Sequence, residues 1–305
     1  MRIDPPGWRS PDLVKVIRRI SSPKSPLPLV TFATFATFAT FEPLAPLVPL
    51  APLAPLAPLK PLDKVNILDV GVARLDLPGL LAQVREWSRD QERRTIFYVN
   101  AHCFNIARQD AAYRNILAAA DLVYADGISV AWAARFLSGA RLTKMTGADW
   151  IHDFCRQAQQ AGLRLYILAG EPGIARLASD NLQNKYPGLK IVGCSDGWFS
   201  ERSQSDVIHE INAASPHVVF ICLGVPRQEK WIAGRRKQIE APVCWGVGAL
   251  FDYVAGVEAR VPRLMNLLAL EWFWRLIMDP RGKWRRYLLG NPLFIYQVLR
   301  QKYGL

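Results

Sequence analysis

Residues 95–102 read TIFYVNAH, and residues 121–129 read DLVYADGIS. The first segment is rich in β-branched and aromatic residues, which favours a buried strand that ends where the polar Asn100 and His102 begin. The second is a short apolar strand that stops at Asp126-Gly127, where glycine permits a sharp turn and a helix can begin with unpaired N–H groups. Open α/β sheets bind ligands beyond the carboxyl ends of their strands. We therefore expect the functional site beside Asn100 and Asp126.

From residue 65 onward, short apolar segments alternate with longer amphipathic ones. This repetition predicts an α/β, Rossmann-like fold with a largely parallel sheet and helices on both of its faces. Strands are expected near residues 65–70, 95–100, 122–124, 164–169, 190–194, 217–223 and 242–247. Helices are expected between them, at residues 77–90, 148–160, 173–185, 204–213 and 227–239.

Glycine-bearing turns follow two more of the expected strands. Gly170 lies in LAGEPG (168–173), a strand-to-helix turn that can bring backbone N–H groups near a phosphate. Gly248 lies in GVGALFD (246–252), which lacks the third glycine of a dinucleotide fingerprint and has no acidic strand end at the usual distance after it. Nicotinamide binding is therefore disfavoured.

The first 62 residues have a different character. Residues 31–41 repeat Thr-Phe-Ala, and proline recurs every third residue from 43 to 61. Such proline spacing excludes a transmembrane helix there and suits polyproline II. We expect residues 1–62 to be a disordered, low-complexity tail, or an upstream extension without function. Residues 63–258 are expected to form the α/β domain, followed by a helical appendage at 259–305.

The expected appendage is apolar and then basic. Residues 264–278 are nearly all apolar except Glu271 and Arg275, which stand four apart on one helical face and can pair. Fifteen helical residues span only about 22 Å, short of the ~30 Å hydrocarbon core of a bilayer. Pro280 ends this segment, and basic residues then alternate with aromatic ones. That pattern fits an interfacial helix on anionic lipid, or a solvated basic face over an ordinary core helix.

The amino-acid composition indicates which classes of binding partner to expect. The formal net charge of +12 over 305 residues favours an anionic partner, whether nucleic acid, membrane or a phosphorylated substrate. The five cysteines form no C-x-x-C pair and indicate buried thiols in a reducing compartment. The four histidines have no zinc-site spacing, so no metal ligands are expected.

The motifs present favour sugar transfer over hydrolysis. There is no G-x-S-x-G elbow or P-loop, and Cys103 and His102 would point to opposite sides of an extended strand. A carboxylate at a strand end with guanidinium groups nearby suits transfer from a nucleotide diphosphate: a base takes the acceptor proton and positive charge stabilises the leaving group. The expected folded part has no Asp-x-Asp, so arginines and helix N-termini would have to replace a divalent ion.

Six separated motifs carry a family resemblance. They are Asn100-Ala101; AADLV (119–123) with Asp126-Gly127-Ile128; TGAD (146–149); GVPRQEKW (224–231); GVG (246–248) with Phe251-Asp252; and EWFWR (271–275) through DPR (279–281) to Arg286-Tyr287. In this order, over residues 66–300, the chain resembles the WecG/TagA/CpsF glycosyltransferase family.

The resemblance implies an inverting, metal-independent bacterial hexosyltransferase that needs no cofactor. It would move N-acetylmannosamine, its uronate or a hexose such as glucose from a UDP-sugar. The implied acceptor is a polyprenyl-diphosphate-linked saccharide used in exopolysaccharide and other cell-surface polysaccharide biosynthesis. The implied location is cytoplasmic, peripheral on the inner face of the plasma membrane. Nucleic acid is not an expected partner, and a homo-oligomer is left open.

The resemblance also assigns residues. Asp126 matches the family's proposed catalytic base, and Gln228 matches a glutamine that contacts the sugar or nucleotide. Arg275, Arg281 and Arg285 resemble arginines that close over the donor diphosphate. Asn100, Asp149, Gly170 and Gly248 complete the expected binding site. This chain has Tyr98 where some members have threonine, and Gly282 where some have arginine.

Other interpretations remain open from the sequence. Asp126 and Asp149 would each suit a helix N-cap, and Gln228 could solvate a helix start. The whole chain could be a non-catalytic nucleotide- or nucleic-acid-binding protein with Rossmann-like topology, or a membrane-docked scaffold with a vestigial site.

Overall fold

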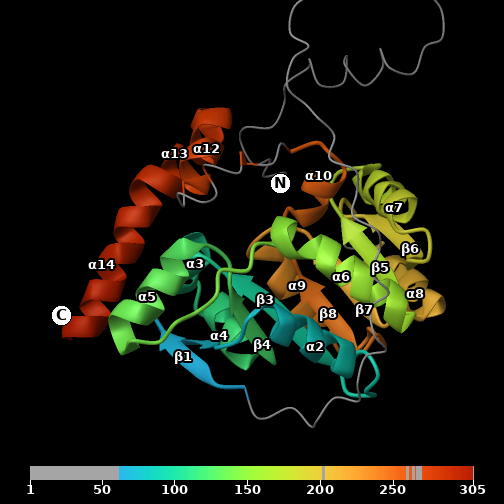
Figure 1. Ribbon diagram of the computed structural model, residues 1–305, viewed down its shortest axis with the longest axis horizontal. Coiled ribbons are helices and arrows are strands. Elements are labelled where there is room, and N and C mark those ends of the chain that lie inside the picture. The colour runs from blue at the N-terminus through green and yellow to red at the C-terminus, as the bar shows by residue number, and fades with distance from the viewer. Residues whose placement is uncertain (1–61, 201–202, 259–260, 263–264, 266–269, 305) are drawn as a thin grey trace, which may run out of the picture. The chain divides into compact units, whose positions relative to one another are not determined.

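A six-stranded parallel sheet lies at the centre of the computed structural model, in the order β4-β3-β8-β7-β5-β6 (Figure 1). The structure describes residues 62–200, 203–258, 261–262, 265 and 270–304, so the expected disordered tail lies outside it except for Leu62. Every residue of β7 is buried, as expected for a strand with helices on both faces. The strands are β3 (Arg94–Val99), β4 (Leu122–Ala125), β5 (Arg164–Ala169), β6 (Lys190–Asp196), β7 (Val218–Cys222) and β8 (Val243–Gly246).

Helices cover both faces of this sheet, and a separate apolar core lies under each layer. Alternate strand residues supply the two cores: Ile96 belongs to one and Phe97 to the other. One layer contains α2 (Leu77–Trp87), α6 (Gly147–Ala161), α7 (Ile174–Lys185) and α10 (Leu250–Val254). The other contains α3 (Ala101–Gln109), α4 (Ala111–Ala119), α5 (Ile128–Ser138), α8 (Gln204–Ala214) and α9 (Arg227–Arg235). The predicted α/β fold is therefore confirmed.

The prediction of a single strand at residues 65–70 is wrong, because this segment contains two short strands. The chain instead forms an antiparallel hairpin apart from the main sheet, made of β1 (Lys64–Ile67) and β2 (Val70–Ala73). Leu68 and Asp69 form its turn and both have positive φ, at 47° and 64°. Tight hairpins usually place Asn-Gly or Asp-Gly in these positions. Leu-Asp lacks that signature, so the turn was missed.

Helices also form the C-terminal part: α12 (Glu271–Met278), α13 (Pro280–Trp284), a π-helical turn η1 (Arg285–Leu289) and α14 (Gly290–Tyr303). As predicted, α12 ends before Pro280, and Arg275 pairs with Glu271 at 2.6 Å. Helix α14 packs on α3, burying Phe294 and Val298 in the core. The boundary near residue 258 stays a prediction. No helix among the described residues combines the length and apolar character needed to cross a membrane.

Candidate active site

Asn100 and Asp126 meet at the carboxyl end of the sheet. Strands β3 and β4 run side by side, and their last residues, Val99 and Ala125, are register partners. The next residue on each strand therefore projects into the same space. Nδ2 of Asn100 donates to Oδ2 of Asp126 at 3.1 Å. The two predicted strand ends thus form one polar site.

Two different local structures hold this pair in place. Asn100 is the N-cap of α3, and its Oδ1 accepts from the backbone N–H groups of His102 and Cys103. Its amide group is thereby oriented with the nitrogen toward Asp126. Asp126 is not a cap, because Gly127 is the N-cap of α5 and makes no side-chain capping bond. The carboxylate of Asp126 is left facing the cleft rather than serving the helix.

The pKa of the Asp126 carboxyl lies above its ordinary value. Burial is the main cause, and the nearby negative charge of Glu271 adds to it. Arg275, the hydrogen bond from Asn100, and Arg286 act in the opposite direction. A carboxylate that holds its proton more tightly than usual is a stronger base. The environment of Asp126 therefore suits proton abstraction.

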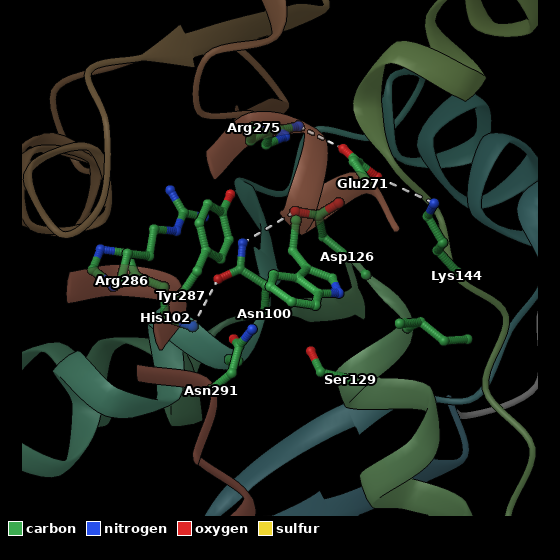
Figure 2. Close-up of a pocket in the computed structure, with 14 residues that line it drawn as sticks. Asn100, His102, Asp126, Ser129, Lys144, Glu271, Arg275, Arg286, Tyr287 and Asn291 are labelled. Atoms are coloured by element: carbon green, nitrogen blue, oxygen red, sulfur yellow. Dashed lines mark hydrogen bonds and ion pairs between the residues drawn. The ribbon is translucent and has the colours of Figure 1, made fainter. Parts of the chain in front are cut away.

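Asp126 forms part of two adjoining pockets. The α5 pocket is lined by the start of α5 and by parts of α12, η1 and α14, including Ile128, Ser129, Lys144, Trp272, Tyr287 and Asn291 (Figure 2). The α6 pocket is lined by the start of α6 and by the turns after β7 and β8, including Tyr98, Thr146, Gly147, Gly224, Gly248 and Tyr253. Both pockets share Asn100, His102, Asp126, Arg275 and Arg286. Asp126 thus lies where the two meet.

A chain of charges joins the sheet domain to α12. Lys144 pairs with Glu271 at 3.2 Å, and Glu271 pairs with Arg275 at 2.6 Å (Figure 2). The guanidinium of Arg275 also lies 5.3 Å from the centre of the Tyr253 ring. The pKa of Glu271 is lowered: burial opposes this shift, but the charges of Arg275 and Lys144 outweigh it. Glu271 therefore stays charged and fixes Arg275 in the cleft.

Apart from Arg275, the C-terminal arginine that lines the pockets differs from those expected from the sequence. Arg281 and Arg285 are exposed and line neither pocket, and Arg285 lies over Trp284. Arg286, one residue further, lines both pockets. Arg285 and Arg286 are the first two residues of η1, and adjacent helical side chains point in different directions, so only Arg286 faces the cleft. Nδ2 of Asn105 donates to the carbonyl of Gly290 at 2.7 Å and holds the end of this turn against α3.

Gln228 lies behind the cleft wall. Its side chain is buried, its Oε1 accepts from the N–H of Gly248 at 3.0 Å, and its Nε2 donates to Glu229 at 2.8 Å. Gly248 in turn lines the α6 pocket with φ of +62°, and a Cβ there would collide with the Tyr98 hydroxyl. In this structure Gln228 holds the Gly248 turn, and its predicted contact with sugar or nucleotide stays untested.

Two other predicted residues lie away from both pockets. Asp149 is exposed in the first turn of α6, whose N-cap is Thr146. Gly170 lies in the turn after β5, close to Ile174 and Asp252. Neither residue lines the α5 or the α6 pocket. Their ligand contacts stay predictions from sequence.

Comparison with known proteins identifies the relatives. A family model described as "Glycosyl transferase WecG/TagA/CpsF family" matches residues 65–305. The chain belongs to this glycosyltransferase family. The N-acetylglucosaminyldiphosphoundecaprenol N-acetyl-beta-D-mannosaminyltransferase of Bacillus subtilis (strain 168) is 30% identical over 204 residues, which cover 67% of this chain and 78% of that protein. The protein of the same name from Staphylococcus aureus (strain MW2) is 25% identical over 243 residues, or 78% and 93%.

In this glycosyltransferase, the sequence interpretation did not assign several cleft residues to the site. Thr146 begins the TGAD motif, Lys144 lies two residues before it, and Arg286 lies in the C-terminal Arg286-Tyr287 motif. Their places in or beside the motifs were available signals. Glu271 was expected only as the partner of Arg275. What the sequence lacked was any sign that residues 144 and 271 come together across the cleft.

His102 and Cys103, which adjoin the site of this glycosyltransferase, are not placed as a catalytic pair would be. His102 and Cys103 lie on α3, not on an extended strand as first expected. Burial raises the pKa of the Cys103 thiol to about 12. Burial and the charge of Arg286 lower the pKa of His102 to about 4, so its imidazole is neutral at neutral pH. Within the described residues there is no group of three His, Cys, Asp or Glu side chains that could hold a metal ion.

Proposed function

We propose that this glycosyltransferase moves a sugar from a UDP-sugar to a polyprenyl-diphosphate-linked saccharide, with Asp126 as the general base. The observation that carries the proposal is the position of Asp126 between two pockets that also share Arg275 and Arg286. A transferase must hold a donor and an acceptor at once, with the base beside the acceptor hydroxyl and positive charge beside the leaving group. The names of the bacterial relatives support the lipid-linked acceptor and point to N-acetylmannosamine as the first sugar to test.

The α6 pocket suits the donor diphosphate. Helix α6 has 15 residues, and its first residues Gly147 and Ala148 line this pocket. Helix N-termini attract anions through unpaired N–H groups and the helix dipole. The buried hydroxyl of Thr146 has no hydrogen-bond partner among the described residues. A phosphate oxygen placed there would satisfy both groups.

The α5 pocket then receives the acceptor saccharide. The acceptor hydroxyl oxygen attacks the anomeric carbon of the sugar as its proton passes to Asp126. The bond between that carbon and the diphosphate oxygen breaks, and the UDP leaves with the electron pair. Because attack and departure occur on opposite faces, a single step inverts the anomeric configuration.

Arginines supply the positive charge for the departing UDP. Arg275 and Arg286 line both pockets, and Glu271 holds Arg275 in position. Guanidinium groups bind phosphate oxygens with paired hydrogen bonds and stay charged at all relevant pH values. This arrangement supports a reaction independent of divalent metal ions.

An exposed apolar and basic surface suits the membrane that carries the acceptor. Trp284, Leu288 and Leu289 are exposed, and Arg281 and Arg285 are exposed beside them on α13 and η1. Basic side chains over aromatic and aliphatic surface bind anionic lipid headgroups. We name these five residues the membrane face, and we propose that it holds the enzyme peripherally on the cytoplasmic side.

A donor and acceptor assay tests the function directly. Purified protein would be given UDP-N-acetylmannosamine, its uronate or UDP-glucose, with a polyprenyl-diphosphate-linked N-acetylglucosamine, with and without EDTA. We expect UDP release and an elongated lipid with one donor, undiminished by EDTA. UDP-sugar binding without release would favour the non-catalytic alternative. Activity lost in EDTA and restored by a divalent ion would contradict metal independence.

A further inference from the structure

An apolar stripe runs along α5 from the mouth of the α5 pocket. It consists of Ile128, Trp132 and Phe136, which are spaced four apart and so share one helical face. Ile128 is 50% exposed and Trp132 is 41% exposed. Phe136, at the other end of the stripe, is partly buried. Large exposed apolar side chains that share one face commonly mark an interaction site.

The stripe is fixed in place rather than loosely presented. Trp132 and Phe136 stack with ring centres 5.4 Å apart and planes at 11°, and Phe136 meets Tyr303 of α14 edge to face at 6.3 Å. Nζ of Lys302 donates to the carbonyl of Leu137 at 3.0 Å and lies 5.8 Å from the Phe136 ring centre. Helices α5 and α14 are thus tied together, side by side (Figure 1). A preformed surface loses little entropy when it binds a flexible ligand.

The stripe is continuous with the site. Ile128 begins the stripe and also lines the α5 pocket, together with Asn291 of α14. One turn beyond Asn291, Ile295 is 44% exposed and adds an apolar side chain on α14, the helix that packs beside α5. The α5 pocket itself contains the cations Lys144, Arg275 and Arg286 against the carboxylates Asp126 and Glu271. A cationic pocket that opens onto an apolar track fits a ligand with an anionic head and a hydrocarbon tail.

We propose that this stripe binds the first isoprene units of the acceptor's polyprenyl chain, while the acceptor diphosphate lies at the mouth of the α5 pocket. The proposal rests on the proposed function, because it assumes a lipid-linked acceptor. From Ile128 to Phe136 the stripe is about 12 Å long, at 1.5 Å per residue, so it contacts only the part of the chain nearest the diphosphate. The membrane face lies on other elements, α13 and η1, which separates chain binding from membrane docking.

Acceptor chain length tests this inference. The variant Trp132→Ser would be assayed in detergent with N-acetylglucosamine diphosphate carrying either an undecaprenyl chain or a short propyl chain. We expect the KM for the undecaprenyl acceptor to rise about tenfold, as removal of a large apolar contact predicts. The KM for the propyl acceptor, the KM for the donor, and liposome binding should stay within about twofold of wild type, since none of them uses the stripe.

Matched variants make the result specific. Trp198→Ser removes another exposed tryptophan, 69% exposed after β6 and outside both pockets, and should change none of these values. Trp132→Phe should retain the wild-type KM, and Ile295→Ser should raise the undecaprenyl KM alone. An undecaprenyl KM in Trp132→Ser that matches wild type, a rise of the same factor in both acceptor KM values, or loss of liposome binding in that variant would overturn the inference. Failure of the proposed function looks different, because wild-type protein would then transfer sugar to neither acceptor.

Discussion

The carboxylate of Asp126 owes its character to neighbours far apart in the sequence. Asn100, the N-cap of α3, donates to it, Glu271 from α12 raises its pKa, and Arg275 and Arg286 lower that pKa. Burial exceeds all of these effects and leaves the pKa raised. The same side chain is therefore costly for the fold and useful as a base, as functional residues often are.

Asp126→Asn should abolish transfer and spare the fold. Without a base, turnover should fall by about 10²- to 10⁴-fold, while UDP-sugar binding persists. Because the raised pKa means that the fold disfavours the charged form, the neutral amide should leave the melting temperature unchanged or higher. Steady-state kinetics and calorimetry would check both. Asp206→Asn, at an exposed position on α8, is the matched control; near-normal turnover in Asp126→Asn would reject the base assignment.

Glu229 should make stability depend on pH. Burial raises the pKa of this fully buried carboxyl from 4.5 to about 7. The folded state then binds this proton more tightly than the unfolded chain does. Protonation of Glu229 therefore stabilises the fold fully below pH 4.5, and this stabilisation is lost as the pH rises through 7. The free energy of unfolding should fall by something on the order of 3 kcal/mol from acidic to alkaline conditions.

Denaturant unfolding at about pH 5 and pH 8 would measure this change. Glu229→Gln keeps an acceptor for Gln228 and should largely remove the pH dependence. Glu240→Gln, at an exposed position, should not. An equal slope of stability with pH in wild type and Glu229→Gln would show that another group is responsible.

At the scale of elements, the π-helical turn η1 contains one arginine that faces the cleft and one that does not. Arg286 lines both pockets, whereas Arg285 is exposed. The family resemblance pointed to Arg281 and Arg285, and Arg286 entered it only as part of the motif Arg286-Tyr287. A π-helical turn at a functional site recurs in other proteins.

Arg286→Gln should lower activity and change its pH profile. Turnover should fall by about 10²-fold, comparable to the loss of one group that stabilises transition-state charge. Arg286 also lowers the pKa of Asp126, so its removal should move the acid limb of kcat/KM to higher pH. Arg281→Gln and Arg285→Gln should leave both properties near wild type on a soluble acceptor. A pH profile in Arg286→Gln that matches wild type would contradict the placement of Arg286 beside Asp126.

Other elements show which parts of the fold could be predicted from the sequence. The main strands were found because their apolar runs end in polar or glycine residues, and the site was expected beside Asn100 and Asp126 for the same reason. The β1–β2 hairpin was missed because Leu68-Asp69 is an atypical turn. The pairing of Lys144 with Glu271 joins segments 127 residues apart. Local pattern cannot indicate contacts over such a separation.

For the whole molecule, docking at the membrane and catalysis should be separable. Deleting the C-terminal helices would also remove Phe294 and Val298 from the core, so loss of activity there would be ambiguous. The double variant Trp284→Ser/Leu288→Ser changes only exposed side chains. We expect liposome cosedimentation to weaken by about tenfold or more, with turnover on a soluble acceptor kept within about twofold.

Leu177→Ser, an exposed apolar position on α7, is the control for this experiment. Unchanged binding of the double variant to anionic liposomes would place the membrane contact elsewhere. Equal loss of soluble activity would indicate that the membrane face also shapes the cleft.

The residues of the site lie far apart along the polypeptide, so they are synthesised at different times. The ribosome makes the sheet with Asp126 first, and Glu271, Arg275 and Arg286 only later. A nascent chain, or one cut short by a premature stop codon after residue 258, would carry the proposed base without Arg275 and Arg286, the cations proposed to neutralise a leaving diphosphate. We expect such a fragment to be inactive, so that no sugar nucleotide is consumed before translation of the later helices.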